Sequence, residues 1–187
     1  MLMEKFLPRK PRLTHTVPGW VEDPEFFVTL CCRPPGENHL CQTPVAIEIF
    51  HTFQFYHQTR ACRMELLVLM PDHLHGILKV PDAVNLTSWM SDAKRWIHRK
   101  TGVTFQENFF DHRLRSPLSA QQKRNYVNRN PVRAGYVSRP DEWPFRFTRS
   151  DFETGGAGSL NSQRAILYEA TKGLVALPSS KPKTQHR

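Results

Sequence analysis

The order of elements that the sequence predicts indicates an α+β protein with a ferredoxin-like split βαβ fold. Short runs rich in β-branched and aromatic residues alternate with segments of helical periodicity, as strand, helix, strand, strand, helix, strand, helix. Two of the strands are separated by only two residues, which favours an antiparallel hairpin. These observations predict an antiparallel sheet of four to five strands with helices on one face, plus an added C-terminal tyrosine-bearing helix. The other face of the sheet is then open for a ligand.

The segment EFFVTLCC, residues 25–32, is rich in residue types that favour strands and makes the first strand. After a loop, the first helix begins at Thr43, whose side chain can cap it, with Pro44 in the first helical position. Apolar residues then recur at nearly helical spacing as far as Tyr56.

The central hairpin is formed by RMELLVLM and HLHGILKV, residues 63–70 and 73–80. Pro71 and Asp72 join the two strands, and both residue types are common in tight turns. Because the connection is too short for a crossover, the two strands pair with each other.

A second helix is predicted over TSWMSDAKRWIHRKTG, residues 87–102. Thr87 or Ser88 caps its start, and Gly102 ends it, since glycine readily takes the backbone conformation that closes a helix.

The fourth strand is predicted over ENFFDHRLR, residues 107–115. A third helix then opens at Ser116 and Pro117, a capping residue followed by proline in the first turn. This helix stops near Pro131, because proline disfavours the helical conformation of the residue before it.

The chain divides into three parts. We expect residues 1–24 to be a basic, proline-rich arm, residues 25–150 to form one folded domain, and residues 151–187 to hold a linker, a short helix and a basic tail. A core of this size is enough for one independently folded domain.

The composition favours a polyanionic partner. Lys and Arg number 26 against 17 Asp and Glu, a formal net charge of +9, which indicates nucleic acid first and an anionic membrane surface second. No run approaches 18 apolar residues, so we expect no membrane-spanning helix and no membrane partner. The four cysteines lack CxxC spacing and no signal-like segment precedes them, so we expect reduced thiols in the cytoplasm.

Two histidines stand one residue apart within an apolar strand. Residues two apart on a strand project to the same face, so His73 and His75 lie side by side while Leu74 points the other way. Two imidazoles at this spacing suit one divalent ion, but two histidines with ordinary hydrogen bonds would show the same pattern.

The third helix offers residues that could complete such a site. Tyr126 and Asn130 are four apart and share a helix face, so an amide oxygen and a phenol would lie about one turn from each other. The alternative is that Asn130 caps the turn opening at Pro131 and Tyr126 is a half-buried aromatic.

Two motifs together resemble a known family. VLMPDHLHGIL, residues 68–78, followed later by YVNRNPVRAGYV, residues 126–137, is similar to the single-tyrosine HUH transposases, most of all to the REP-associated tyrosine transposase group. FVTL, FFDHRLR and RPDEWPF match further landmarks of that family. The resemblance covers residues 25–147.

The resemblance implies a site and a reaction. His73 and His75 would bind a divalent metal, Mg²⁺ or Mn²⁺, with Asn130 as a polar third ligand, and Tyr126 would be the nucleophile. The implied activity is metal-dependent cleavage and strand transfer of single-stranded, hairpin-containing DNA through a 5′-phosphotyrosine intermediate. The alternative is a domesticated protein that binds hairpin DNA without cutting it. Family members assemble the site within a monomer or across a homodimer, and both remain open.

A DNA-processing role would make the protein nucleoid-associated, and its basic residues could then contact DNA phosphates. His112 is a candidate general base because it precedes the tyrosine helix closely. Trp89 and Trp96 fall on the apolar stripe of the second helix, which favours a core role over base stacking. The candidate phosphate contacts are Lys94, Arg95, Arg113, Arg115, Lys123, Arg124, Arg129 and Arg133.

Overall fold

The computed structural model describes residues 23–81 and 84–154. In chain order its elements are β1 (Glu25–Arg33), α1 (Thr43–Gln58), β2 (Arg63–Leu69), β3 (His73–Lys79), α2 (Leu86–Thr101), β4 (Thr104–Phe105), β5 (Phe110–Leu114), α3 (Pro117–Asn128), α4 (Asn130–Arg133), η1 (Pro140–Glu142), β6 (Arg146–Thr148) and α5 (Arg149–Glu153).

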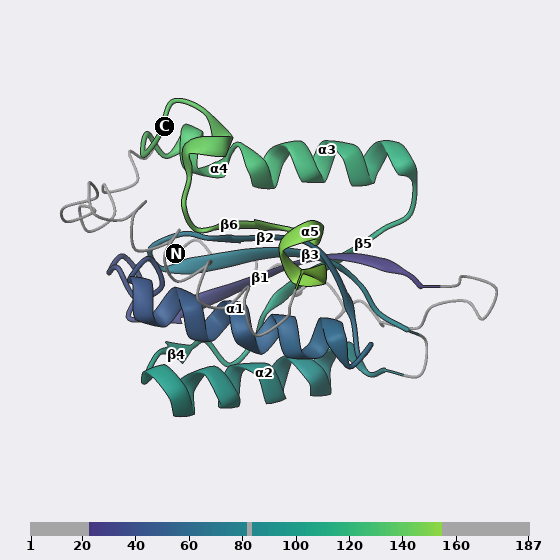
Figure 1. Cartoon of the computed structure of the whole chain (residues 1–187), viewed down its shortest axis with the longest axis horizontal. Helices are drawn as coiled ribbons and strands as arrows, with labels where there is room; N and C mark the ends of the chain where they lie inside the picture. The colour runs from purple at the N-terminus through teal and green to yellow at the C-terminus, as the bar shows by residue number, and fades with distance from the viewer. Residues whose placement is uncertain (1–22, 82–83, 155–187) are drawn as a thin grey trace, which may run out of the picture.

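The strands form one antiparallel sheet in the order β4-β1-β3-β2-β6 (Figure 1). Strand β5 pairs with β1 on the same side as β4, so β1 has partners along both edges. The core order β5-β1-β3-β2 is that of a split βαβ sheet, and the predicted ferredoxin-like α+β fold is confirmed. The short strand β6 extends the sheet beyond β2.

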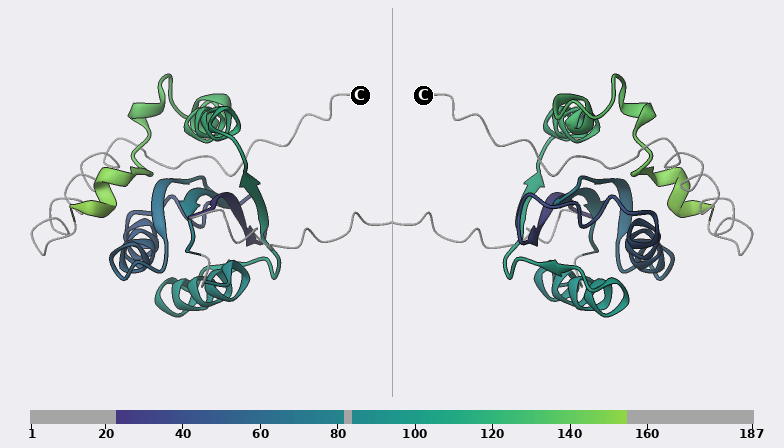
Figure 2. Two further views of the ribbon diagram at one scale, coloured as in Figure 1. Left: turned by 90° about the vertical axis from the view of Figure 1, so that its right-hand side faces the viewer. Right: turned by 90° about the vertical axis from the view of Figure 1, so that its left-hand side faces the viewer.

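Helices cover both faces of the sheet. Helices α1 and α2 lie side by side on one face, while α3 crosses the other (Figures 1 and 2). The expectation that this second face is open was therefore wrong in part. Successive side chains of β1 point to opposite faces of the sheet, so one strand contacts both helical layers. Val28 and Leu30 are buried toward α1 and α2, whereas Phe27 contacts Tyr126 of α3.

Local signals set most helix ends as predicted. Ser116 caps α3 through a reciprocal pair of hydrogen bonds with Ser119, and Pro117 follows it. Gly102 ends α2 in the left-handed region, with φ of 76°. The predicted cap of α2 was wrong by a few residues, because the Asn85 side chain accepts the hydrogen bond from the backbone N–H of Ser88.

The predicted strand 107–115 is shorter in the structure, where Phe110–Leu114 forms β5. A further short strand that was not predicted, β4, precedes it at Thr104–Phe105. The third helix also ends sooner than predicted, at Asn128, and Asn130 opens α4 after a single intervening residue. Two adjacent helical segments therefore replace the predicted helix and turn.

The described fold runs past the predicted domain boundary at residue 150. In α5, Phe152 is fully buried and stacks on Phe50 of α1, so this helix belongs to the packed core. The predicted N-terminal arm, apart from its last two residues, and the predicted short helix and tail lie outside the described residues. All four cysteines are free thiols. Among the described residues, no helix is long and apolar enough to span a membrane.

Candidate functional site

The histidine pair begins β3, on the sheet face that α3 crosses. Its backbone partners on β1 are Cys31 for His73 and Thr29 for His75. The two imidazole rings lie 4.8 Å apart between centroids, and Leu74 between them is fully buried toward the opposite helices. The prediction that the two histidines share one face is confirmed.

One nitrogen of each imidazole is held by a polar neighbour. His73 Nδ1 donates to the Asp72 carboxylate over 2.7 Å, and the other carboxylate oxygen accepts from the Gly36 N–H over 2.9 Å. The hydrogen bond with His73 is the main reason why the pKa of Asp72 falls from 3.8 to about 2, so this carboxylate is charged near neutral pH. Thr29 Oγ1 lies 2.9 Å from His75 Nδ1. Such partners fix the ring orientation and direct Nε2 outward.

Asn130 completes the cluster through its side-chain amide, whose nitrogen lies 2.8 Å from His75 Nε2. It does not cap the turn at Pro131, because Arg129 is the N-cap of α4 and that alternative is wrong. A half turn about the Cβ–Cγ bond of Asn130 would exchange the amide nitrogen for the oxygen at the same place. Asn130 can therefore offer His75 a donor, or offer a cation an oxygen ligand beside it.

His75 is neutral and rigidly placed. The residue is only 5% exposed. This burial is the main reason why the pKa of His75 falls from 6.5 to about 3, and the nearby charges of His73 and Lys123 lower it further. With an amide N–H donating to Nε2, the ring proton resides on Nδ1 and points to Thr29. A neutral imidazole with an available Nε2 lone pair is the form that binds metals.

The donor set fits a divalent cation that accepts nitrogen and oxygen ligands. Two imidazoles and an amide oxygen suit Mn²⁺ or Mg²⁺ better than a soft metal. Within residues 23–81 and 84–154 no three His, Cys, Asp or Glu side chains gather in a metal-binding group. The polar side chain that contacts His75 Nε2 is the amide of Asn130.

Tyr126 lies beside this cluster on α3. Its ring centroid is 5.9 Å from that of His75 and 6.3 Å from that of Phe27, which it meets edge-on. The residue is 39% exposed, so solvent or a substrate can reach it. Lys123 Nζ and the Arg133 guanidinium carbon lie 5.1 and 5.2 Å from the ring centroid. A phenol between two cations is placed well to meet an anionic phosphate.

A cavity of about 250 Å³ opens next to Tyr126, between β5 and α3. Its lining includes Lys123 from α3 and His112 from β5. The structure therefore brings the candidate base into the same cavity as the tyrosine, because His112 is the backbone partner of Phe27 and alternation puts both on the α3 face.

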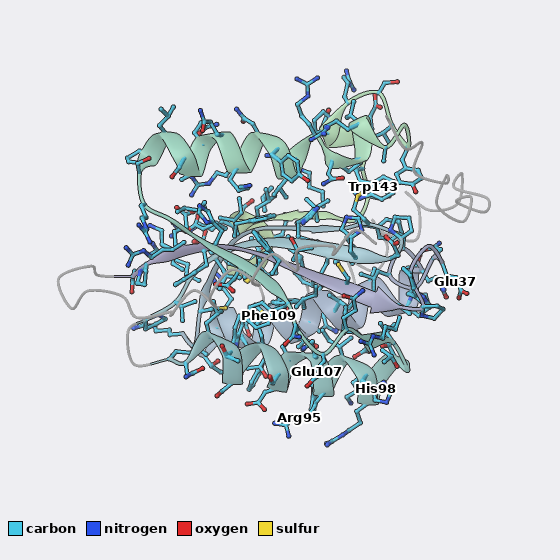
Figure 3. All side chains as sticks on the ribbon, turned by 180° about the vertical axis from the view of Figure 1, so that it is seen from behind. Glu37, Arg95, His98, Glu107, Phe109 and Trp143 are labelled. Atoms are coloured by element: carbon cyan, nitrogen blue, oxygen red, sulfur yellow. The ribbon has the colours of Figure 1, made fainter. Side chains whose placement is uncertain are left out.

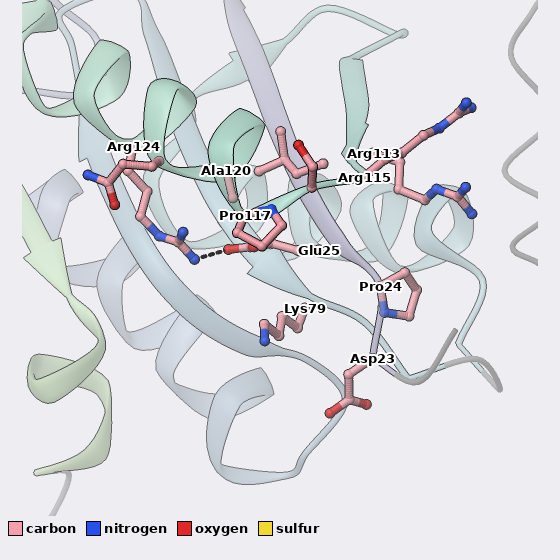
Figure 4. Close-up of a pocket in the computed structure, with 12 residues that line it drawn as sticks. Asp23, Pro24, Glu25, Lys79, Arg113, Arg115, Pro117, Ala120 and Arg124 are labelled. Atoms are coloured by element: carbon pink, nitrogen blue, oxygen red, sulfur yellow. Dashed lines mark hydrogen bonds and ion pairs between the residues drawn. The ribbon is translucent and has the colours of Figure 1, made fainter. Parts of the chain in front are cut away.

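The candidate phosphate contacts divide into three groups. Lys123 and Arg133 flank Tyr126, with the exposed Arg129 at the α3–α4 junction. Arg113, Arg115 and Arg124 gather at the start of α3 (Figure 4).

Helix α2 carries the third group, on the opposite side of the sheet from Tyr126. Arg95 projects from the outer surface of α2 and pairs with Asp92 (Figure 3). The Lys94 ammonium donates to the Gln106 carbonyl over 3.1 Å, which is a structural contact. The same helix corrects the predicted stripe, because Trp89 is buried as expected but Trp96 is 45% exposed.

The sequence pattern did not single out Thr29, Asp72 or Phe27. Thr29 and Phe27 reach the site only through the register of β1 with β3 and β5, which no local pattern reveals. Asp72 had a detectable signal, since a carboxylate directly before a histidine is a suitable orienting partner.

Known proteins were compared with this chain by sequence. No protein-family model matches it. The REP-associated tyrosine transposase of Escherichia coli K12 is 28% identical over 92 residues, which cover 47% of this chain and 55% of that protein. A relative from Haemophilus influenzae named for the same family is 23% identical over 97 residues, covering 42% and 54% of the two chains. The chain thus spans about half the length of the curated relatives it matches.

A solved structure supports the fold. A REP-associated tyrosine transposase bound to a REP hairpin superposes with a TM-score of 0.61 and 21% identity, over 75% of this chain and 86% of that one. The likeness in fold therefore extends over more of the chain than the likeness in sequence.

Proposed function

We propose that this chain, which is similar to the REP-associated tyrosine transposases in sequence and shares their fold, binds hairpin-forming single-stranded DNA and cuts and rejoins it through Tyr126. The observation that carries the proposal is the juxtaposition of Tyr126 with His75 and Asn130 on the sheet of one chain. A solved relative is described as bound to a REP hairpin, which favours hairpin DNA as the partner here.

His73, His75 and Asn130 are the residues proposed to hold a divalent cation, Mg²⁺ or Mn²⁺. When bound, such a cation would act as a Lewis acid toward a phosphodiester oxygen. Asp72 and Thr29 keep the two imidazoles oriented, so little rearrangement is needed to form the site.

The chemical step proposed for Tyr126 is an attack of its hydroxyl oxygen on a backbone phosphorus. As the new O–P bond forms, the bond from phosphorus to the 3′ oxygen breaks, giving a 5′-phosphotyrosine and a free 3′-hydroxyl. The phenol proton passes to a base, for which His112 is the candidate in the same cavity, and the departing 3′ oxygen takes up a proton. A 3′-hydroxyl can reverse the step, so one phosphodiester replaces another.

The cations around Tyr126 have two uses in this reaction. Lys123 and Arg133 attract the phosphodiester, and their charges favour the phenolate that develops during the attack. Lys123 also lies 4.6 Å above the Phe27 ring, which restricts where its ammonium can move.

The decisive experiment incubates the protein with Mn²⁺ and hairpin-forming single-stranded oligonucleotides from the DNA beside the gene. Denaturing electrophoresis should show a covalent protein–DNA adduct that disappears with a metal chelator. Tyr126→Phe should abolish the adduct and leave binding nearly intact. Tyr56→Phe is the matched control, because Tyr56 of α1 packs edge-on against Trp89 of α2 on the opposite face of the sheet, and its loss should leave the adduct unchanged.

Two other outcomes would point to different functions. Binding without cleavage, across metals and sequences, would favour a protein that recognises hairpins without cutting them. Cleavage that persists in Tyr126→Phe, with no adduct, would mean that water is the nucleophile.

A further inference from the structure

A second cavity, of about 500 Å³, opens at the other end of α3 from Tyr126. It lies where the ends of β3, β1 and β5 meet the first turns of the helix, since Lys79, Glu25 and Leu114 are neighbours across the three strands. Figure 4 shows its basic side chains, with Arg113 and Arg115 projecting to one side and Arg124 on the other.

The lining carries more positive charge than its own carboxylates can neutralise. Glu25 pairs with Arg124, and Asp23 lies 3.9 Å from Arg63 outside the cavity. Among the residues that the structure describes, Lys79, Arg113 and Arg115 have no ion-pair partner. Three unpaired cations around one open cavity form an anion site, because guanidinium groups bind phosphate oxygens in a forked geometry.

The distance to Tyr126 fits a continuous nucleic-acid strand. The cavity extends along α3 from Pro117 to Arg124, and its far edge at Pro117, next to Arg115, is nine residues from Tyr126, an axial separation of about 14 Å. At the roughly 3.4 Å rise per nucleotide of a stacked strand, this corresponds to about four nucleotides. The cavity and Tyr126 border the same helix, so one strand that lies along α3 can contact both.

We propose that this cavity is a second phosphate site, which holds the DNA strand about four nucleotides from the phosphate that lies next to Tyr126. The inference rests on the proposed function, because it assigns a further contact to the same DNA substrate. Arg115 and Lys79 contact the strand, and Arg113, whose side chain leaves β5 on the opposite face from His112, adds positive charge at the rim of the cavity.

The test compares two double variants that remove the same charge. Arg113→Gln with Arg115→Gln alters the cavity, whereas Arg99→Gln with Lys100→Gln alters the exposed outer face of α2 around Trp96. Both are made in a Tyr126→Phe background, so the DNA stays intact, and circular dichroism melts check that each variant folds. The probes are fluorescent hairpin oligonucleotides from beside the gene, with single-stranded tails of zero to eight nucleotides on either end.

The measured quantity is the slope of log affinity against log salt concentration. The cavity variant should reduce the magnitude of this negative slope by about 1 to 2 relative to the parent, because one or two phosphate contacts are lost. The α2 variant should keep the slope of the parent. The difference should appear only when one tail reaches about four nucleotides. Equal slopes for the two variants at every tail length would overturn the inference.

The failure of this inference is distinguishable from failure of the proposed function. If the adduct forms on Tyr126 but the cavity variant binds like the α2 variant, only the second phosphate site is wrong. If no hairpin binds and no adduct forms, the proposed function fails and the phosphate site fails with it.

Discussion

His73 and His75 show how polar neighbours hold two imidazole rings in a fixed orientation on a strand. Asp72 and Thr29 each engage one ring nitrogen, so the rings cannot turn and the remaining nitrogen of each keeps its direction. Burial lowers the pKa of His75 to about 3, so the ring remains neutral at physiological pH.

The role of Asp72 can be tested separately from catalysis. Asp72→Ala removes the carboxylate that orients His73, and Mn²⁺ affinity should fall by about 10- to 100-fold, measured by electron paramagnetic resonance of free Mn²⁺. Asp92→Ala, which removes an exposed carboxylate on α2, should leave the affinity unchanged. A folded Asp72→Ala protein with the affinity of the parent would contradict the orienting role.

Among the elements, those with a strong periodicity were predicted well. The hairpin of β2 and β3 followed from two short apolar runs, and period two alone put His73 and His75 on one face. The position of α3 could not be derived in the same way, because only Ala120 and Val127 of this helix are buried and so small a stripe does not indicate which surface it covers.

Two smaller errors have local causes. Asn85, Thr87 and Ser88 are all suitable caps, and the choice depends on the path of the preceding loop rather than on residue type. Trp96 lies at the edge of the buried stripe of α2 and projects to solvent beside Arg99 and Lys100. The cap of α2 and the exposure of Trp96 both depend on tertiary structure, which residue type alone does not indicate.

The junction of α1 with β2 should make stability depend on pH. His57 Nδ1 accepts a hydrogen bond from the Met64 N–H over 3.1 Å, and burial lowers the pKa of His57 below 6.5. The folded protein therefore binds this proton less readily than the unfolded chain. The stabilisation is present above pH 6.5 and is lost as the pH falls below it.

His57→Phe isolates this contribution. The variant keeps a ring next to Phe152 but leaves the Met64 N–H without its acceptor, so it should be less stable by about 1 kcal/mol at pH 8. Urea unfolding from pH 8 to pH 5 should show this difference shrinking as the wild type becomes protonated. A difference that stays constant over the range would mean that His57 does not carry the effect.

At the level of the whole molecule, the candidate site is formed within one chain. The tyrosine helix folds back onto its own sheet, where Tyr126 meets His75 and Asn130 meets the same ring. In this arrangement one chain supplies both the tyrosine and the histidines of the candidate site.

Complementation between inactive variants tests this arrangement. An equal mixture of Tyr126→Phe and His75→Ala proteins should give no adduct, because neither chain holds both the tyrosine and the intact histidine pair. Restored adduct in the mixture, on the His75→Ala chain, would show that the tyrosine acts on the site of another subunit.

Strand β1, paired along both edges, has a consequence for how the molecule opens. Its amides should be among the slowest to exchange with deuterium, because they are released only when the central sheet separates. Helix α3 buries only Ala120 and Val127 and should exchange faster. Tyr126 should therefore be able to move with its helix while the sheet that carries His73 and His75 stays folded.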